Sequence, residues 1–340
     1  MQKPLKILVI MTKKIGDTLL CTPLLSAIKE EHSNADIDFL AKYPASEILE
    51  RNPDINKIYI INKTPWLKLI SEIRKKRYDF IIDLYPTEKT ALICALSKCE
   101  NKIRGYFLRP KLYHRIYNIR PDYYATNQTY VANRQIKFLE GILFKKVKTF
   151  PKMTLILPPD IHDIKKAYFK KYNISSDNLL IGFVPQGSHP LKMWPAESWK
   201  RLAELIIQKY STKAKIFIFI DKNGQDFAKR MCPRDVKNIF IPQCENLTQL
   251  SSYISFLNLA VTVCTGTKHI AIALDVPTIT IQTITNPNTW HPSGNPKHRL
   301  VSAQGLDCLY CDKTICNPVT APCLVNLKPE LVFNELTNML

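Results

Sequence analysis

The sequence predicts an α/β protein made of two Rossmann-like domains that face each other across a cleft. A short apolar run at residues 7–10, typical of a buried parallel strand, leads through a turn into an amphipathic helix. Further strand-sized runs alternate with helices of about a dozen residues, as parallel sheets require. A proline-rich break at residues 150–160 precedes a second series of the same kind, and 340 residues are enough for two separate cores.

The first domain is expected to cover residues 1–155. Its strands are expected where apolar and β-branched residues cluster, and its helices where apolar residues recur at helical spacing. The expected strands are residues 7–10, 37–40, 58–61 and 80–84, and the expected helices are residues 17–32, 44–51 and 66–77.

The second domain is expected to cover residues 156–325. Residues 326–340 are expected to form a C-terminal helix that packs back on the first domain. The expected strands of the second domain are residues 179–184, 216–220, 239–241, 259–263 and 278–281, and its expected helices are residues 163–172, 196–209, 225–230, 247–256 and 268–274.

The composition is that of a soluble globular protein with a large positive charge. Hydrophobic residues make up 46% and charged residues 23%, and no apolar run approaches the ~20 residues that span a bilayer. The first apolar run is short and is followed by Lys13-Lys14, so no signal peptide is expected and the protein is placed in the cytoplasm. The formal charge of +19 favours anionic partners, although solvated surface explains it as well.

One segment, residues 104–130, interleaves basic and aromatic side chains. Its arginines include Arg109, Arg115 and Arg120, and seven aromatic side chains lie between and around them. This alternation suits a membrane interface or a sugar-phosphate acceptor. It would also suit RNA, although no nucleic-acid partner is expected here.

The turn after the first strand is a candidate site for chemistry. Ligands of open α/β sheets bind beyond the carboxyl ends of the strands, and this turn lies there. Gly16 lets the backbone turn, and Asp17 then faces the crevice at the start of the helix, with Lys13 and Lys14 beside it. The alternative is that Asp17 only caps its helix.

Two stretches of the second domain suit phosphate binding. After the strand at 179–184, Gly187 and Ser188 can present donors to a phosphate that Lys192 neutralises. After the strand at 259–263, the helix N-terminus attracts anions through its free amides and its dipole. The residues of this second stretch are Cys264, Thr265, Gly266, Thr267, Lys268 and His269, of which His269 is alternatively a packed core histidine.

Ten cysteines in a chain placed in the cytoplasm are unlikely to form a disulfide scaffold. Four of them follow the spacing C-x2-C-x4-C-x6-C, which could take a tetrahedral structural zinc ion but no catalytic metal. These four are Cys308, Cys311, Cys316 and Cys323.

The motifs at residues 16–28, 187–199 and 265–278 resemble glycosyltransferase family 9, the bacterial heptosyltransferases that move heptose from ADP-heptose to the lipopolysaccharide inner core. The resemblance implies the GT-B architecture. It also implies that Asp17 is the catalytic base and that Lys192, with Ser188, holds the donor diphosphate. A ribose-binding acid would lie near Asp226.

The sequence departs from the family pattern at three places. Cys264 stands where relatives usually carry an aspartate, residues 282–285 replace Gly-Pro-Thr, and Lys13 or Lys14 replaces an arginine. These departures keep open a catalytically altered or silent relative that binds a different nucleotide sugar or a glycolipid. A nucleic-acid-binding protein is a further alternative.

The resemblance implies an inverting, metal-independent transfer that needs no cofactor. The donor would be ADP-heptose or a related nucleoside-diphosphate sugar. The acceptor would be a phosphorylated, Kdo-bearing lipid A core, which Lys13, Lys14, Gly16 and the three arginines of the basic segment would contact. We expect a monomer, peripheral to the inner face of the cytoplasmic membrane.

Overall fold

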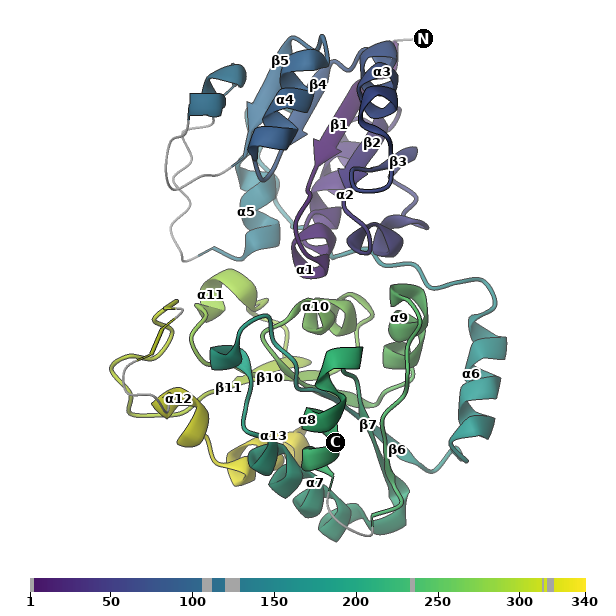
Figure 1. Cartoon of the computed structure of the whole chain (residues 1–340), viewed down its shortest axis with the longest axis vertical. Helices are drawn as coiled ribbons and strands as arrows, with labels where there is room; N and C mark the ends of the chain where they lie inside the picture. Colours follow the sequence, from purple (N-terminus) through teal and green to yellow (C-terminus); the bar gives the residue numbers. More distant parts are fainter. Residues whose placement is uncertain (1–2, 106–111, 120–128, 233–235, 314, 317–320) are drawn as a thin grey trace. The chain divides into compact units, whose positions relative to one another are not determined.

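A computed structural model describes residues 3–105, 112–119, 129–232, 236–313, 315–316 and 321–340 (Figure 1). The chain folds as two units, which are called unit 1 and unit 2 below. Unit 1 comprises Met1–Ile156 and unit 2 comprises Leu157–Leu340.

Unit 1 is built on a parallel sheet of five strands in the order β3-β2-β1-β4-β5. β1 lies in the middle because its residues after Lys6 are apolar on both faces and are fully buried. The strands are β1 (Lys6–Ile10), β2 (Asp36–Ala41), β3 (Lys57–Ile60), β4 (Phe80–Asp83) and β5 (Asn101–Arg104).

The helices of unit 1 cover both faces of this sheet. Leu8 and Ile10 of β1 share one apolar cluster with residues of α3 and α4, so the alternate residues Ile7 and Val9 face the opposite side. The helical segments are α1 (Ile15–Leu19), α2 (Thr22–Glu31), η1 (Ala45–Leu49), α3 (Trp66–Lys76), α4 (Glu88–Leu96), η2 (Leu112–Ile116) and α5 (Val131–Lys137).

The sequence predicts one helix at residues 17–32, but the structure has two. α1 ends at Leu19 and α2 begins at Thr22. Pro23 lies in the first turn of α2, where its missing N–H costs nothing, and in a continuous helix it would interrupt the hydrogen bonds. Gly16 lies inside α1 and is not among the glycines with a left-handed backbone, so the expectation that it forms a tight turn is wrong.

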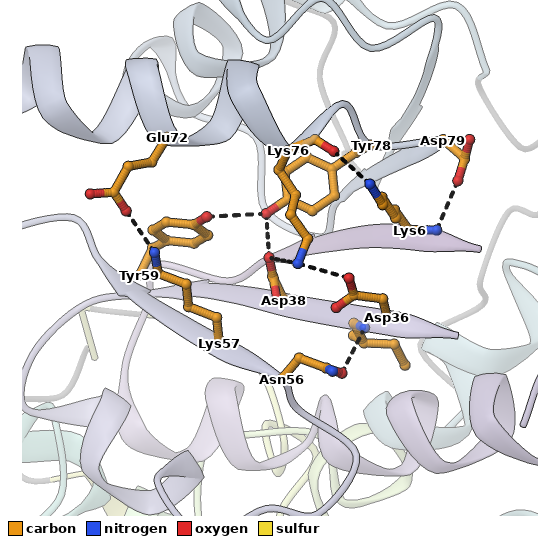
Figure 2. A network of polar contacts seen from close by, with 11 residues as sticks. Lys6, Asp36, Asp38, Asn56, Lys57, Tyr59, Glu72, Lys76, Tyr78 and Asp79 are labelled. Atoms are coloured by element: carbon orange, nitrogen blue, oxygen red, sulfur yellow. Dashed lines mark hydrogen bonds and ion pairs between the residues drawn. The ribbon is translucent and has the colours of Figure 1, made fainter. Parts of the chain in front are cut away.

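A polar network closes the amino-terminal edge of this sheet (Figure 2). The ammonium of Lys76 lies 2.7 Å from a carboxylate oxygen of Asp36 and 3.5 Å from one of Asp38, and the Tyr78 hydroxyl donates to Asp38 at 2.6 Å. Burial raises the pKa of Asp38, and the contacts from Tyr78 and Lys76 oppose that rise. Because β1, β2 and β3 begin here, the opposite edge of the sheet is left for ligand chemistry.

Asp83, at the carboxyl end of β4, is a buried acid whose titration can be measured. Its carboxylate accepts a hydrogen bond of 2.6 Å from the Tyr117 hydroxyl, yet burial raises the pKa of Asp83 to about 6. A raised carboxyl pKa means that the folded state holds the proton more tightly than the unfolded chain. Stability therefore falls as the pH rises from the unfolded value of about 4 to about 6, by about 3 kcal/mol in total.

Asp83→Asn is expected to flatten this part of the pH profile and to raise the free energy of unfolding at pH 8, because the amide oxygen can still accept from Tyr117. The expected gain is about 1–3 kcal/mol. Urea denaturation at pH 5 and pH 8 measures it, with Glu30→Gln on the exposed face of α2 as the matched control. Equal pH slopes for the two variants would contradict the prediction.

Unit 2 holds a parallel sheet of six strands in the order β11-β10-β9-β6-β7-β8. The order reverses at β6, which lies between β9 and β7, and such switch points are where open sheets bind ligands. The strands are β6 (Leu179–Val184), β7 (Ala214–Ile218), β8 (Ile239–Phe240), β9 (Leu259–Val263), β10 (Thr278–Ile281) and β11 (His298–Val301).

The helical segments of unit 2 follow its strands (Figure 1). They are α6 (Ile161–Lys171), η3 (Pro190–Lys192), α7 (Ala196–Tyr210), η4 (Ser211–Lys213), η5 (Lys222–Gly224), α8 (Gln225–Met231), α9 (Leu247–Ser255), α10 (Gly266–Ala273), α11 (Pro287–Trp290), α12 (Pro322–Val325) and α13 (Pro329–Met339). None of the helices in the described ranges is long and apolar enough to cross a bilayer.

The C-terminal helix α13 belongs to unit 2, and the expected packing of this helix on the first domain stays a prediction. Val332 and Leu336 are fully buried in the main apolar cluster of unit 2. Glu330 also forms an ion pair with Arg201 of α7. The helix is therefore held by core packing in the same unit.

Candidate active site

In unit 1, three side chains meet at the carboxyl edge of β1 and β4. The Lys13 ammonium lies 3.8 Å from a carboxylate oxygen of Asp17 and 4.0 Å from the centre of the Tyr85 ring. The carboxylate side chain is 18% exposed, so it can meet a ligand without being fully solvated. A carboxylate beside an ammonium, over an aromatic surface, can accept a proton from a sugar hydroxyl.

The alternative reading of Asp17 as a helix cap is wrong. Lys14 occupies the N-cap position of α1 and no side chain makes a cap hydrogen bond there. Asp17 is the third residue of the helix, and its backbone carbonyl accepts from the Cys21 thiol at 3.1 Å. Burial and the negative charge of Asp17 raise the pKa of Cys21 well above its usual value, so this thiol stays protonated.

The predicted acceptor residues are only partly described. Lys14 is exposed beside the site and Arg115 is exposed on η2, whereas Arg109 and Arg120 lie outside the described residues. Tyr117, from the same basic and aromatic segment, is fully buried and donates to Asp83. That tyrosine belongs to the core of unit 1 and not to a surface for membrane contact.

In unit 2, the loop after β6 holds Lys192 by close backbone packing. A Cβ atom on Gly187 would lie 2.8 Å from the Cβ of Lys192, so glycine is needed for this approach. The carbonyl of Leu191 accepts from the Thr283 hydroxyl at 2.8 Å, and Trp194, fully buried, donates to the carbonyl of Leu327 at 3.3 Å. Lys192 itself is half-buried, and Ser188 is exposed near the start of the loop.

The second predicted stretch lies at the carboxyl end of β9. Thr265 is the N-cap residue of α10 but makes no cap hydrogen bond with its side chain. Its hydroxyl and the half-exposed Gly266 and Thr267 therefore remain available to a ligand. An anion at this helix end would meet free amides and the positive end of the helix dipole.

His269 is buried, as the alternative of a packed core histidine predicts, but its polar atoms are not all paired. Its Nδ1 atom is buried without a hydrogen-bond partner in the described part of the chain. Burial and the positive charge of Lys268 hold the pKa of His269 well below its usual value, so the imidazole is neutral. An unpaired nitrogen here can exchange a hydrogen bond with a bound ligand.

Three residues to which the sequence assigned no role in the site also support this edge. Gln282, in the loop that replaces Gly-Pro-Thr, donates to the backbone carbonyl and to the hydroxyl of Thr285, both at 2.6 Å. Asp312 is the third: partial desolvation raises its pKa, and the hydrogen bond from the Asn286 amide and the positive charge of Lys192 oppose that rise. Residues 282–285 were noted only as a departure from the family pattern and Asp312 stands in no recognisable motif, so only their spatial proximity reveals this role.

Asp226 does not occupy a site-like position. Its side chain is 93% exposed on α8 and pairs with Lys229 at 3.2 Å. The carboxylate that comes closer to the end of β7 is Asp221, which accepts from the amides of Asn223 and Gly224 at 2.9 and 3.1 Å. The ribose-binding role of Asp226 stays a prediction.

Three of the four spaced cysteines belong to or pack against one apolar cluster, and the fourth, Cys308, is exposed. Cys311 and Cys316 pack against a cluster that contains Cys323 and Ile284, and all ten cysteines of the chain are free thiols. Burial, followed by the negative charges that Cys308, Cys316 and Cys311 would carry, raises the pKa of Cys323 to about 11. Among the described residues no group of three or more His, Cys, Asp or Glu is placed to hold a metal ion. The structure therefore gives no set of ligands for the predicted zinc ion.

Comparison with known proteins decides the family. The description "Glycosyltransferase family 9 (heptosyltransferase)" matches residues 66–317, most of the chain. The chain belongs to glycosyltransferase family 9. It is a glycosyltransferase of the heptosyltransferase family, whose members take part in synthesis of the lipopolysaccharide core.

Relatives in this family match over nearly the whole chain. Lipooligosaccharide heptosyltransferase 2 of Haemophilus influenzae is 22% identical over 351 residues, which cover 99% of each chain. Lipopolysaccharide heptosyltransferase 1 of Campylobacter coli is 24% identical over 291 residues, covering 82% of this chain and 83% of the relative.

Solved structures of the family share the fold. The Escherichia coli ADP-heptose lipopolysaccharide heptosyltransferase II superposes with a TM-score of 0.80 at 20% identity, covering 98% of each chain. A family 9 glycosyltransferase from Veillonella parvula gives 0.84 at 18% identity, covering 100% of this chain and 98% of its own. The predicted GT-B fold class, with two Rossmann-like units, is confirmed.

Proposed function

We propose that this glycosyltransferase moves a heptose, or a closely related sugar, from ADP-heptose to a lipopolysaccharide inner-core acceptor with inversion of the anomeric centre. The donor is suggested by two solved relatives, one titled an ADP-heptose heptosyltransferase and another, WaaC, solved with ADP-2-deoxy-2-fluoro heptose. The observation in this chain that carries the proposal is the set of cationic and neutral donor groups at the carboxyl edge of the unit 2 sheet.

Unit 2 would bind the donor diphosphate. Lys192 supplies a positive charge and the N-terminus of α10 supplies backbone amides. The Thr265 hydroxyl makes no capping hydrogen bond, so it can also donate to the diphosphate. Charge that is fixed before the reaction stabilises a leaving diphosphate without the reorganisation that water would need. We expect these groups to stabilise the leaving diphosphate without a divalent cation.

Unit 1 would supply the base. Asp17 takes the proton from the acceptor hydroxyl while that oxygen attacks the anomeric carbon, and the bond to the departing diphosphate breaks on the opposite side. One displacement of this kind inverts the anomeric centre. Lys13, held between Asp17 and the Tyr85 ring, would meet a phosphate of the acceptor core.

With this acceptor the protein would act at the inner face of the cytoplasmic membrane. A net charge of +19 favours anionic lipid headgroups and the phosphates of lipid A. Sedimentation with vesicles that contain anionic lipid, compared with neutral vesicles, tests this part of the proposal.

The central experiment is a product assay. Purified protein is incubated with ADP-heptose and a Kdo-bearing lipid A acceptor, with and without EDTA, and the product is detected by mass spectrometry and its anomeric configuration by NMR. We expect one added heptose, an inverted linkage and no loss of rate with EDTA. Transfer from a UDP-sugar or GDP-sugar alone would refute the proposed donor.

A silent or altered relative is the second candidate, favoured by the non-acidic Cys264, which is 8% exposed at the end of β9. It would bind a different nucleotide sugar or a glycolipid and would give no transfer product from ADP-heptose in the same assay.

A further inference from the structure

The feature that the proposed mechanism leaves unused is a buried lysine at the donor edge of unit 2. Lys268 is the third residue of α10 and its side chain is fully buried. Its ammonium donates to the backbone carbonyl of Trp290 at 2.7 Å and lies 3.8 Å from the Cys264 sulfur. None of the ion pairs in the described part of the chain involves Lys268.

A buried ammonium with no acidic partner is costly, and fully buried lysines are rare unless they are paired. Burial lowers the pKa of Lys268, and the positive charge of Lys192 lowers it further, whereas the Cys264 thiol raises it. The positive charges of the two lysines therefore repel each other. A ligand that carried negative charge between them would relieve this repulsion.

Two histidines near Lys268 also have ring nitrogens that could bond to a ligand. The buried Nδ1 atoms of His269 and His291 have no hydrogen-bond partner among the described residues. The other ring nitrogen of His291 lies 3.0 Å from the carbonyl of His298, and burial with the nearby Lys268 charge lowers the pKa of His291 to about 4. The carboxyl group of Asp312, whose pKa the positive charge of Lys192 lowers against desolvation, is exposed.

Lys268 also ties together the two segments that form this edge. It belongs to α10, which follows β9, and it holds the last residue of α11, which follows the neighbouring strand β10. The Trp290 amide in turn donates to the carbonyl of Asn286, at the start of α11. A substitution at Lys268 would thus remove a charge and also loosen α11, and an experiment has to separate these two effects.

We propose that Lys268 is a positioning residue that makes the donor site of unit 2 selective for a nucleoside diphosphate: its buried charge is compensated only when a diphosphate lies near Lys192 and the α10 N-terminus. This inference rests on the proposed donor. It goes further because it assigns the discrimination between a diphosphate and an uncharged nucleoside to a side chain that does not touch the ligand.

Lys215 provides a matched control. It is also a buried lysine of unit 2, 8% exposed, and its ammonium donates to one backbone carbonyl, that of Tyr172, at 3.3 Å. Lys215 is the second residue of β7 and so lies toward the amino-terminal edge of the sheet, away from the donor edge. Lys215→Met therefore removes a similar buried charge without touching the proposed site.

The experiment measures binding of ADP and of adenosine by calorimetry to the unaltered protein, Lys268→Met and Lys215→Met. We expect Lys268→Met to weaken ADP binding by about tenfold or more and adenosine binding by less than about twofold. Lys215→Met is expected to bind both ligands as the unaltered protein does. Lys268→Gln, which can still donate to Trp290, is measured as well and should match Lys268→Met, since a charge effect does not depend on that hydrogen bond.

Equal losses for ADP and adenosine would overturn the inference, because they would mean that α11 had simply loosened. Unchanged ADP binding by Lys268→Met or by Lys268→Gln would also overturn it, while leaving the proposed donor intact. If the unaltered protein failed to bind ADP, both the proposed donor and this inference would be refuted. Should Lys268→Met not fold, as judged by its melting curve, Lys268→Gln decides between the same outcomes.

Discussion

Asp17→Asn is expected to lower kcat by about 10²–10⁴-fold, the range that a positioned general base contributes. The asparagine has nearly the same size and keeps the α1 backbone, but it cannot take the proton of the attacking hydroxyl. Binding of ADP should change by less than about twofold, because the donor groups lie on unit 2. Steady-state transfer rates and ADP titrations measure the two quantities.

The ion pair between Lys13 and Asp17 requires a control for Asp17→Asn. Without its partner, Lys13 would keep its place over the Tyr85 ring but lose a neighbouring charge. Lys13→Met tests this contribution and should raise the KM for the acceptor with a smaller effect on kcat. An Asp17→Asn protein that transferred sugar at the full rate would remove Asp17 from the mechanism.

The sequence predicts most strands because apolar runs in a parallel sheet are short and distinct. The predicted strands at residues 179–184, 259–263 and 278–281 match β6, β9 and β10. The edge strands β5 and β11 were not predicted, and β7 is shifted, since the prediction starts at Ile216 and the strand begins at Ala214. The predicted strand starts too late because Lys215 was not expected to be buried. Its burial is possible because the ammonium donates to a backbone carbonyl, which the sequence does not reveal.

The candidate site could be predicted only where a motif carries it. Lys192 and Thr265 stand in recognisable loops at strand ends, and the structure places both at the carboxyl edge of the unit 2 sheet. The state of Lys268 could not be predicted, because its burial depends on α11, which follows a different strand. Long-range contacts of this kind leave no periodic signal in a sequence.

The packing of α13 in unit 2 could not be predicted for a related reason. Its apolar face is visible in the sequence, but the surface that it covers is not. Leu336 joins the cluster of unit 2, and the ion pair between Arg299 and Glu335 links the helix to the edge strand β11. Neither partner lies close to α13 in the sequence, so a helix with one apolar stripe could equally have been assigned to the other unit.

Lys192→Met is expected to lower kcat/KM by about 10²–10³-fold, the loss found when one preorganised group that stabilises charge in the transition state is removed. Methionine keeps the length and the apolar stem, so the close packing of Gly187 against the Cβ atom at this position is retained. The loss should appear in both kcat and the donor KM, because the charge acts on the bound diphosphate and more strongly on the departing one. Rates measured over a range of ADP-heptose concentrations separate the two terms.

Lys166→Met, on the exposed surface of α6, is the matched control for this change of charge. It lowers the net charge by the same amount but leaves the donor edge intact, so its kcat/KM should stay within about twofold of the unaltered protein, since exposed charges are screened by salt. If both variants lost activity equally, the positive charge would act through the overall field of the protein. The assignment of Lys192 to the leaving diphosphate requires instead that the loss be confined to Lys192→Met and that added salt fail to reproduce it.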